Sequence, residues 1–386
     1  MAVGEQTCCV CGSAHLRRID AFGSLSRVTS DCVPFRPGGR LAVCVCCGAA
    51  QSLADEQWFA EIAEIYGKYD IYNQSGRVEQ HVFDPVGGSL RPRSELLLER
   101  LLEVSGVPLV GKVLDVGCGS GGTLNAFSKR GNWALYGLDI DDRNLPSLRV
   151  VRGFRDLYSC SPAEVSEQFN IITLVHSLEH FPSPRETLND LRGKLSPNGS
   201  LFIEVPNAAA NPFDYVVADH LMHFTPETLA YLVRRAGFHV RCIATDWVAK
   251  EISLVAVPQH DEAVRPQTPI GGAHRNVMKQ VNWLRRFSRA AVKSAVTTAP
   301  ATPFGVFGTS VAAAWLWPAV SNWVEFFVEE DVNRIGRTYM GRPVISPTQT
   351  PTGAVIFLAL VPPIAAAIRA RLKTLPVDFR MPPPLP

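Results

Sequence analysis

Two cysteine pairs near the N-terminus have the spacing of metal ligands. Cys8 and Cys11 form one Cys-x-x-Cys pair, and Cys44 and Cys47 form the other. Each tight turn presents two sulfurs to one ion, and four thiolates complete the tetrahedral coordination of a structural Zn²⁺. We therefore predict one structural Zn²⁺ at these cysteines, with no open position at which to activate water. Buried or redox-active thiols are the alternative interpretation.

The segment LDVGCGSGG predicts a second ligand site. It begins as an apolar strand and ends in a glycine-rich turn before a helix, so backbone N–H groups and the helix N-terminus face a nucleotide-like ligand. Gly117, Gly119 and Gly121 form a Gly-x-Gly-x-Gly pattern. With Gly122 as the third glycine, the same letters form the dinucleotide pattern Gly-x-Gly-x-x-Gly. The glycines alone leave both ligands open.

Two carboxylates beside this turn narrow the choice of ligand. Asp139 follows the next predicted strand, in GLDID, where a carboxylate accepts hydrogen bonds from both hydroxyls of a ribose. Asp115 directly precedes the glycine turn, where it suits a cationic amino-acid ligand and would repel a pyrophosphate. Together they favour a nucleoside ligand that carries an amino-acid group.

A histidine motif follows the predicted strand FNIITLV. His176, Glu179 and His180 match the His-x-x-Glu-His pattern of zinc proteases. That pattern places both histidines on one α-helix, whereas the preceding residues predict a strand. We therefore do not interpret it as a protease site.

A second group of ionisable residues lies in the segment ADHLMHFTPETL, which contributes Asp219, His220 and His223 ahead of a helix with capping signals at Thr225. Because histidine titrates near neutral pH, several histidines and carboxylates on one loop face predict a functional base. Helix capping or burial in the core is the alternative for each histidine.

Length and composition limit the number of domains, the class of partner and the location of the protein. The 386 residues allow two or three domains, and Lys+Arg 38 against Asp+Glu 36 gives a net charge of +2, which predicts neither a nucleic-acid nor a membrane partner. The N-terminus lacks the basic and apolar regions of a signal peptide, so we expect a cytoplasmic location with reduced thiols. Two uncharged stretches, residues 294–324 and 343–368, contain prolines that favour buried strands and helices over membrane spans.

Short apolar runs alternate with helical segments along the chain, which indicates an α/β fold with an open sheet. We predict four parts: a small N-terminal zinc module with a helix, the ligand-binding α/β domain, a linker with a helix, and a smaller C-terminal α/β (Rossmann-like) domain. Their expected ranges are residues 1–72, 73–260, 261–300 and 301–386.

The motifs LDVGCGSG, GLDID and NIITLVHSLEH, in this order within about residues 95–258, resemble those of class I S-adenosylmethionine-dependent methyltransferases. The resemblance implies a Rossmann-like seven-stranded sheet that ends in an antiparallel hairpin, with S-adenosylmethionine as the cofactor. It also implies that Asp115 and the glycine turn hold the methionine portion and that Asp139 holds the ribose. His176, at the mouth of the site, is expected to join these cofactor-binding residues.

The whole chain also resembles the deoxysugar C-methyltransferases of natural-product and surface-polysaccharide pathways. The resemblance rests on a CxxCGS start, a CxxCGxxQ second cysteine pair, and the C-terminal segment FFVEEDVNRIGRTYMGRPVISP. It implies a nucleotide-linked 4-keto-6-deoxysugar as substrate, from which a base removes the proton next to the ketone. The family's Tyr-x-Glu-His element corresponds to residues 217–220, where Val217 replaces Tyr and Asp219 replaces Glu.

By this correspondence His220 is expected to be the base, with Asp219 orienting it and His180 polarising the substrate oxygen. His176 is the fourth catalytic candidate. The C-terminal domain is expected to help enclose the small-molecule substrate. The alternatives are an O- or N-methyltransferase of another small molecule, a non-catalytic protein that binds zinc and cofactor, and a dinucleotide oxidoreductase.

Overall fold

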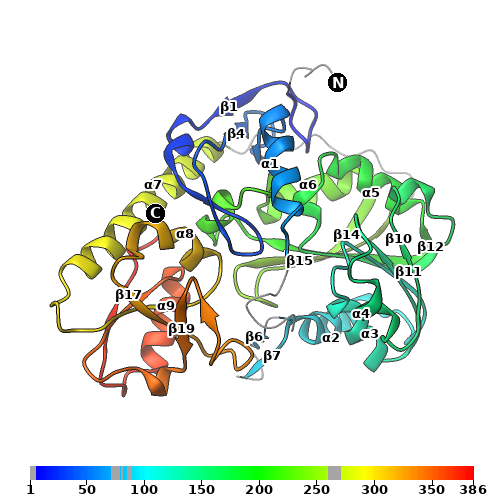
Figure 1. Cartoon of the computed structure of the whole chain (residues 1–386). Helices are drawn as coiled ribbons and strands as arrows, with labels where there is room; N and C mark the ends of the chain where they lie inside the picture. Colours follow the sequence, from blue (N-terminus) through cyan, green and yellow to red (C-terminus); the bar gives the residue numbers. More distant parts are fainter. Residues whose placement is uncertain (1–5, 71–78, 80, 85–88, 260–270) are drawn as a thin grey trace.

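The computed structural model describes residues 6–70, 79, 81–84, 89–259 and 271–386. Two expected domain boundaries, near residues 72 and 260, lie outside the described residues. Figure 1 shows an N-terminal part in blue, a central sheet in cyan and green, and a C-terminal sheet in orange and red. The long helix α7 (Ala273–Val296) precedes the C-terminal sheet.

The N-terminal part is built on a four-stranded sheet with the order β1-β4-β5-β13. Its strands are β1 (Leu16–Arg18), β4 (Leu41–Cys44), β5 (Ala50–Ser52) and β13 (Met222–His223), accompanied by the hairpin β2 (Arg27–Val28) and β3 (Pro34–Phe35). Helix α1 (Glu56–Tyr66) begins after Asp55, whose side chain accepts a hydrogen bond from the Trp58 amide at 3.2 Å. Because β13 comes from the central part of the chain, the expected zinc module shares its sheet with that part.

The central sheet has seven strands in the order β10-β9-β8-β11-β12-β15-β14. Their bounds are β8 (Val110–Val116), β9 (Asn132–Leu138), β10 (Phe154–Tyr158), β11 (Phe169–Val175), β12 (Leu195–Pro206), β14 (Phe238–Ala244) and β15 (Glu251–Pro258). β8 to β12 pair in parallel, whereas β15 pairs antiparallel with both β12 and β14. The predicted seven-stranded sheet with its antiparallel hairpin is therefore confirmed.

Helices cover both faces of the central sheet (Figure 1). They are α2 (Arg93–Ser105), α3 (Gly122–Lys129) and α4 (Leu145–Arg149) on one face and α5 (Pro184–Arg192) and α6 (Pro226–Arg235) on the other, and the hairpin β6 (His81–Phe83) and β7 (Leu90–Pro92) precedes α2. Helix α6 begins with a capping box formed by Thr225 and Thr228, as the sequence predicts. Parallel strands that are covered on both faces direct their carboxyl ends toward one edge, where such folds bind ligands.

The C-terminal part is a six-stranded sheet with the order β18-β19-β17-β16-β20-β21. The strands are β16 (Phe304–Phe307), β17 (Val324–Val328), β18 (Thr338–Tyr339), β19 (Arg342–Ile345), β20 (Val355–Leu358) and β21 (Asp378–Arg380), and its helices are α8 (Val311–Val320) and α9 (Pro362–Arg371). All pair in parallel except the short β18. This arrangement matches the predicted small α/β unit.

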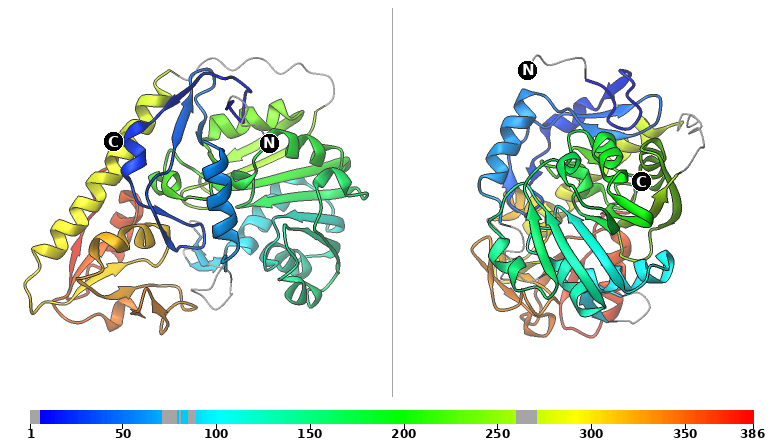
Figure 2. Two further views of the ribbon diagram at one scale, coloured as in Figure 1. Left: turned by 45° about the horizontal axis from the view of Figure 1, so that its top comes forward. Right: turned by 90° about the vertical axis from the view of Figure 1, so that its right-hand side faces the viewer.

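Helix α7 joins the three parts through a common core. Trp283 and Phe287 on its inner face are fully buried, and their ring centroids lie 5.5 Å and 4.9 Å from that of Phe213 in the central part. Trp315 of α8 donates a hydrogen bond to the Ser26 carbonyl of the N-terminal part at 2.6 Å. Both views in Figure 2 show the three parts packed together.

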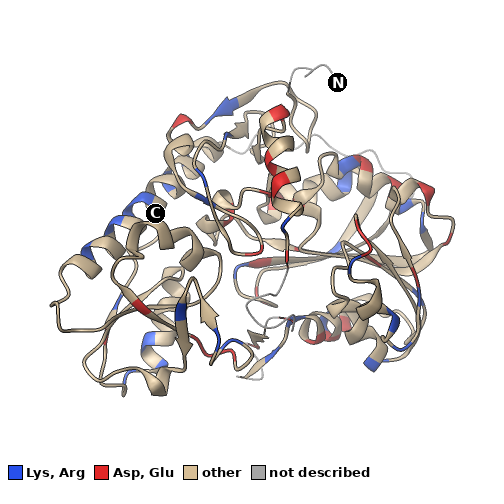
Figure 3. Cartoon of the chain, viewed as in Figure 1, with Lys and Arg blue, Asp and Glu red and all other residues tan. Residues whose placement is uncertain are grey.

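The outer face of α7 is basic and exposed (Figure 3). Its exposed cations are Arg275, Lys279, Arg286, Arg289 and Lys293. The two uncharged stretches form parts of α7, β16, α8, β19, β20 and α9, with loops between them. Among the described residues, no helix has both the length and the apolar character that a membrane span requires.

Candidate functional site

The four predicted zinc ligands converge. The Sγ atoms of Cys8, Cys11, Cys44 and Cys47 all lie within 4.8 Å of one another. The closest pairs are Cys8 with Cys47 and Cys11 with Cys44, each at 3.5 Å. All four are free thiols, and all except Cys11 are buried.

The chemistry of this group fits Zn²⁺. A hydrogen bond from the protonated thiol to the Cys44 sulfur raises the pKa of both Cys8 and Cys47, so ionising all four thiols without a cation carries a penalty. A divalent cation removes that penalty, and four sulfurs close its coordination shell. The site would therefore hold the β1, β4 and β5 region together without taking part in chemistry.

The glycine turn lies between β8 and α3, at the carboxyl end of the central strand. Gly117 has φ +74°, and a Cβ there would lie 2.5 Å from the Ser177 side chain, so only glycine fits. Gly121 has φ +85° and precedes the first turn of α3. By contrast, a Cβ on Gly119 would meet no described atom within 4 Å, which leaves open space above the turn for a ligand.

The two predicted cofactor carboxylates flank this turn. Asp139, directly after β9, accepts hydrogen bonds from the Gly119 amide at 2.7 Å and the Ile140 amide at 2.8 Å. Asp115 is buried and accepts a hydrogen bond from the Thr173 hydroxyl at 2.6 Å. Burial, assisted by the charge of Asp139, raises the pKa of Asp115 to about 7. A buried carboxyl of this kind suits an ammonium group, and the site fits S-adenosylmethionine.

Sequence reasoning missed Glu79, a third carboxylate beside the turn. Its oxygens accept hydrogen bonds from the amide and hydroxyl of Ser94, both at 2.6 Å, at the start of α2. It lies 3.4 Å from the position of a Cβ on Gly122. No motif marks this residue, because its position depends on the chain that precedes the sheet.

The predicted base, His220, belongs to a buried triad. Its Nδ1 lies 2.8 Å from Asp214 Oδ1, and Nδ1 of His223 lies 2.8 Å from Asp214 Oδ2. Burial lowers the pKa of His220, but the hydrogen bond and charge of Asp214 outweigh it, and the pKa is raised. Burial raises the pKa of Asp214, but the two histidines outweigh it and lower that pKa to about 2. Asp214 therefore fixes the ring of His220 and stabilises its protonated form.

The expectation that Asp219 orients the His220 ring is wrong in its geometry. The carboxylate of Asp219 instead accepts hydrogen bonds from the amide and hydroxyl of Ser30, in the N-terminal part. The short 3₁₀ turn at Pro212–Val216 brings Asp214 to the histidine in its place. Asp219 thus ties the loop to the N-terminal part.

His180 lies next to His220, with ring centroids 4.7 Å apart. Its Nδ1 is 3.0 Å from the Asp219 carbonyl oxygen and 3.1 Å from the hydroxyl of Tyr66, the last residue of α1. Burial, with the charge of His220, lowers the pKa of His180. The neutral His180 ring can donate one hydrogen bond, and the His220 ring can act as a base in its unprotonated form. The role of Tyr66 was not predicted, because its helix precedes the central domain in the chain.

His176 sits at the mouth of the central sheet, as expected, but in an ion-pair network. It has φ +52°, and its Nε2 lies 3.2 Å from Glu251 Oε2, while Arg93 contacts the other oxygen of Glu251 at 2.9 Å. Burial lowers the pKa of His176, but the charge of Glu251 outweighs it and raises the pKa to about 9. His176 is therefore a cation at neutral pH and is unsuited to act as a base. The non-helical φ also separates this segment from the zinc-protease pattern.

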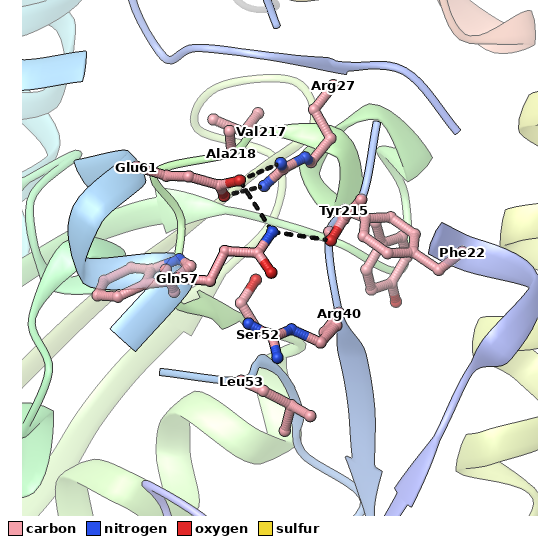
Figure 4. Close-up of a pocket in the computed structure, with 13 residues that line it drawn as sticks. Phe22, Arg27, Arg40, Ser52, Leu53, Gln57, Glu61, Tyr215, Val217 and Ala218 are labelled. Carbon is pink, nitrogen blue, oxygen red and sulfur yellow. Dashed lines mark hydrogen bonds and ion pairs between the residues drawn. The ribbon is translucent and has the colours of Figure 1, made fainter. Parts of the chain in front are cut away.

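The N-terminal part supports the loop that carries these groups. The Ala218 amide donates to the Val28 carbonyl at 2.8 Å. Beside this contact, Figure 4 shows the buried pair of Arg27 and Glu61, which are joined by two hydrogen bonds of 2.7 and 2.9 Å. Val217 and Ala218, which directly precede Asp219 and His220, line the pocket in Figure 4.

Comparison with known proteins gives a family match over the central part. Residues 90–243 match the family model of a methyltransferase domain. A ubiquinone biosynthesis O-methyltransferase from Neisseria meningitidis serogroup C (strain 053442) is 27% identical over 154 residues, with 33% of this chain and 64% of the relative covered. One from Azoarcus sp. (strain BH72) is 30% identical over 125 residues, with 30% and 53% covered. The chain thus spans less than two thirds of either relative.

Solved methyltransferase structures also resemble this chain. The Burkholderia thailandensis 1,6-didemethyltoxoflavin-N1-methyltransferase, with bound 1,6-didemethyltoxoflavin and S-adenosylhomocysteine, has 19% identity and a TM-score of 0.40 over 55% of this chain and 96% of its own. The glycopeptide N-methyltransferase MtfA, in complex with S-adenosylmethionine, has 16% identity and a TM-score of 0.36 over 43% and 93%.

The family match agrees with three features of the central part. These are the strand order, the glycine turn after β8, and the carboxylates at the ends of β8 and β9. Residues 90–243 therefore match a methyltransferase domain in sequence, with a strand order and a glycine turn that fit S-adenosylmethionine.

Proposed function

We propose that this protein transfers a methyl group to the carbon next to the ketone of a nucleotide-linked keto-deoxysugar. The observation that carries the proposal is the buried Asp214–His220 pair beside His180, at the edge where the cofactor turn lies. Removal of a proton from carbon needs a positioned base and a donor for the oxygen that gains charge. The resemblance of the whole chain to sugar C-methyltransferases supplies the substrate class.

In this mechanism His220 takes the proton from the substrate carbon, and Asp214 stabilises the imidazolium that forms. His180, in the tautomer whose Nδ1 accepts a hydrogen bond from the Tyr66 hydroxyl, donates a hydrogen bond from Nε2 to the ketone oxygen as it becomes an enolate. When bound, S-adenosylmethionine would supply a methyl group on a sulfonium: the electron pair of the carbon–hydrogen bond forms the new carbon–carbon bond, and the pair of the broken methyl–sulfur bond stays on the sulfur, which leaves as a neutral thioether. Asp115 and Asp139 hold the two ends of the cofactor.

Incubation with S-adenosylmethionine carrying a ¹³C-methyl group tests this function. We expect a panel of nucleotide-linked 4-keto-6-deoxysugars to yield a product whose label is bonded to carbon, as determined by NMR. The matched control is each sugar with its ketone reduced to a hydroxyl, which should remain unlabelled. Label on oxygen, or labelling of the reduced sugar, would contradict C-methylation.

The second candidate is O-methylation of another small molecule. It is supported by the names of the curated relatives, which are O-methyltransferases. A hydroxyl nucleophile requires the same base but no stabilised enolate. The label position in the experiment above separates the two candidates.

A further inference from the structure

The proposed function leaves one buried acid beside the active site unexplained. Glu179 lies on a short 3₁₀ turn, Leu178–His180, and is fully buried. Neither of its side-chain oxygens has a hydrogen-bond partner among the described residues, and its nearest ion-pair contact is His176 Nδ1 at 3.5 Å. Burial of an ionised carboxylate without hydrogen bonds is costly. The cation His176 offsets part of this cost from 3.5 Å, but both oxygens of Glu179 keep lone pairs that a second cation could take.

Two histidines converge with Glu179. One carboxylate oxygen of Glu179 and one ring nitrogen each of His180 and His220 lie within 4.8 Å of one another. Two imidazoles and one carboxylate form a ligand set for divalent transition metals, and imidazole suits zinc, copper, iron and nickel in particular.

Both histidines are held as metal ligands usually are. Nδ1 of His220 contacts Asp214, and Nδ1 of His180 contacts the carbonyl oxygen of Asp219. Metal-binding histidines almost always donate one ring N–H to a carboxylate or carbonyl in this way, which leaves the lone pair of the other nitrogen available. In both rings that nitrogen is Nε2, and for His180 this is the tautomer opposite to the one that donates to the ketone in the proposed function.

The charge around the three residues favours a cation as well. Asp214, Asp219 and Glu179 are all buried, at 2%, 0% and 0% exposure. The cation His176 contacts Glu179. When His180 and His220 are neutral, as metal ligands must be, the three acids together with His176 leave a net negative charge. A divalent ion balances it.

We propose that Glu179, His180 and His220 bind a divalent transition metal such as Zn²⁺, and that the bound ion inhibits methyl transfer. The ion occupies Nε2 of His220, the atom that takes the proton in the proposed function, so metal and substrate proton compete for one lone pair. The inhibition rests on the proposed function, whereas the metal binding does not. Unlike the four-cysteine site, this site has three protein ligands and an open position.

Metal content tests the binding. We expect the full-length protein, after equilibrium dialysis against Zn²⁺, to bind about two ions per chain, one at the cysteines and one here. Glu179→Gln should reduce this to about one. Glu186→Gln, at an exposed glutamate on α5, is the matched control and should retain both ions. One ion in the wild type, or two in Glu179→Gln, would overturn the proposal.

The second variant His180→Gln keeps the test decisive if Glu179→Gln fails to fold, as judged by circular dichroism. It removes a different ligand and should also lose the second ion.

Activity tests the inhibition. Added Zn²⁺ should inhibit wild-type methyl transfer, and Glu179→Gln should weaken this inhibition by at least about 10-fold relative to its own uninhibited rate. Inhibition should also weaken at lower pH, because protons compete for the histidines. Unchanged inhibition in Glu179→Gln would refute the proposed inhibition. If a second ion binds through Glu179 but no keto-sugar is methylated, the metal site stands and the proposed function fails.

Discussion

At the scale of single residues, the candidate site depends on which acid faces which histidine. The sequence indicated His220 as a base, and its raised pKa and contact with Asp214 suit that role. It did not indicate Asp214, because a partner six residues upstream becomes a neighbour only through the 3₁₀ turn that joins them. The only available signal was an acid inside the apolar run PFDYVV. Asp115 and Asp139 were easier to predict, since their places follow from strand ends alone.

The first prediction concerns this pair. A base must be unprotonated, so activity falls as the pH drops below the pKa of His220, which Asp214 raises. Asp214→Asn should therefore move the acid limb of the pH–rate profile to lower pH and reduce kcat by about 10²-fold. Asp219→Asn is the control, because that carboxylate bonds to Ser30, and its acid limb should stay closer to that of the wild type. Equal shifts of the acid limb in both variants would indicate that Asp219 also sets the pKa of His220.

The second prediction concerns Asp115. Its pKa of about 7 without a ligand means that it is partly protonated near neutral pH, whereas a cationic ligand requires the ionised form. S-Adenosylmethionine binding should release a proton and weaken by up to about 10-fold per pH unit below about pH 7. Calorimetry in buffers of different ionisation enthalpy measures this release. Asp115→Asn should bind more weakly and show little pH dependence; an unchanged proton release in that variant would exclude Asp115 as its source.

At the scale of elements, strand and helix positions were predictable where the apolar pattern was strong. The runs that became β8, β11 and β15 and the amphipathic α2 are examples. The short β13 was not predicted, since two residues carry no periodicity and the strand forms only by pairing with β5. Contacts between elements distant in the chain, such as β2 with Glu61 of α1, were also beyond the sequence pattern.

The third prediction tests this last contact. Glu61 is buried against Arg27; burial raises its pKa, but the Arg27 hydrogen bonds outweigh it and the pKa is lowered. Glu61→Gln leaves a buried arginine without its counter-ion and should lower the free energy of unfolding by about 3–5 kcal/mol. The exposed pair of Arg36 and Glu64 provides the control, and Glu64→Gln should cost about 0–1 kcal/mol. Denaturant unfolding compares the two variants, and similar costs would contradict the assigned role.

The same pair predicts a pH dependence of stability. A carboxyl whose folded-state pKa is depressed contributes stability above its unfolded pKa of about 4.3, and the contribution is lost as the pH falls further. The difference in stability between the wild type and Glu61→Gln should therefore shrink as the pH falls below about 4.

At the scale of the whole molecule, the loop that carries Asp219 and His220 is built jointly by the part that matches a methyltransferase domain and by the N-terminal part. β13 extends the sheet of that part, Ser30 holds Asp219, and Tyr66 contacts His180. The sequence predicted separate parts because it shows composition shifts and linkers, not contacts between distant segments. The cofactor turn, by contrast, lies within the central domain.

The last prediction follows from this division of the molecule. Cys44→Ser should lose the N-terminal zinc, because it removes one of four sulfurs from a closed site. β4 and β5 then lose their anchor, and with them the support for the loop that carries His220. We expect methyl transfer to fall by at least about 10-fold while S-adenosylmethionine affinity changes little, since Asp115 and Asp139 depend on the central sheet. Metal analysis and calorimetry on one preparation measure both effects. Cys46→Ser, at an exposed cysteine outside the group, is the matched control and should behave as the wild type. Full activity in a zinc-free Cys44→Ser protein would show that the loop that carries His220 forms without support from the zinc site.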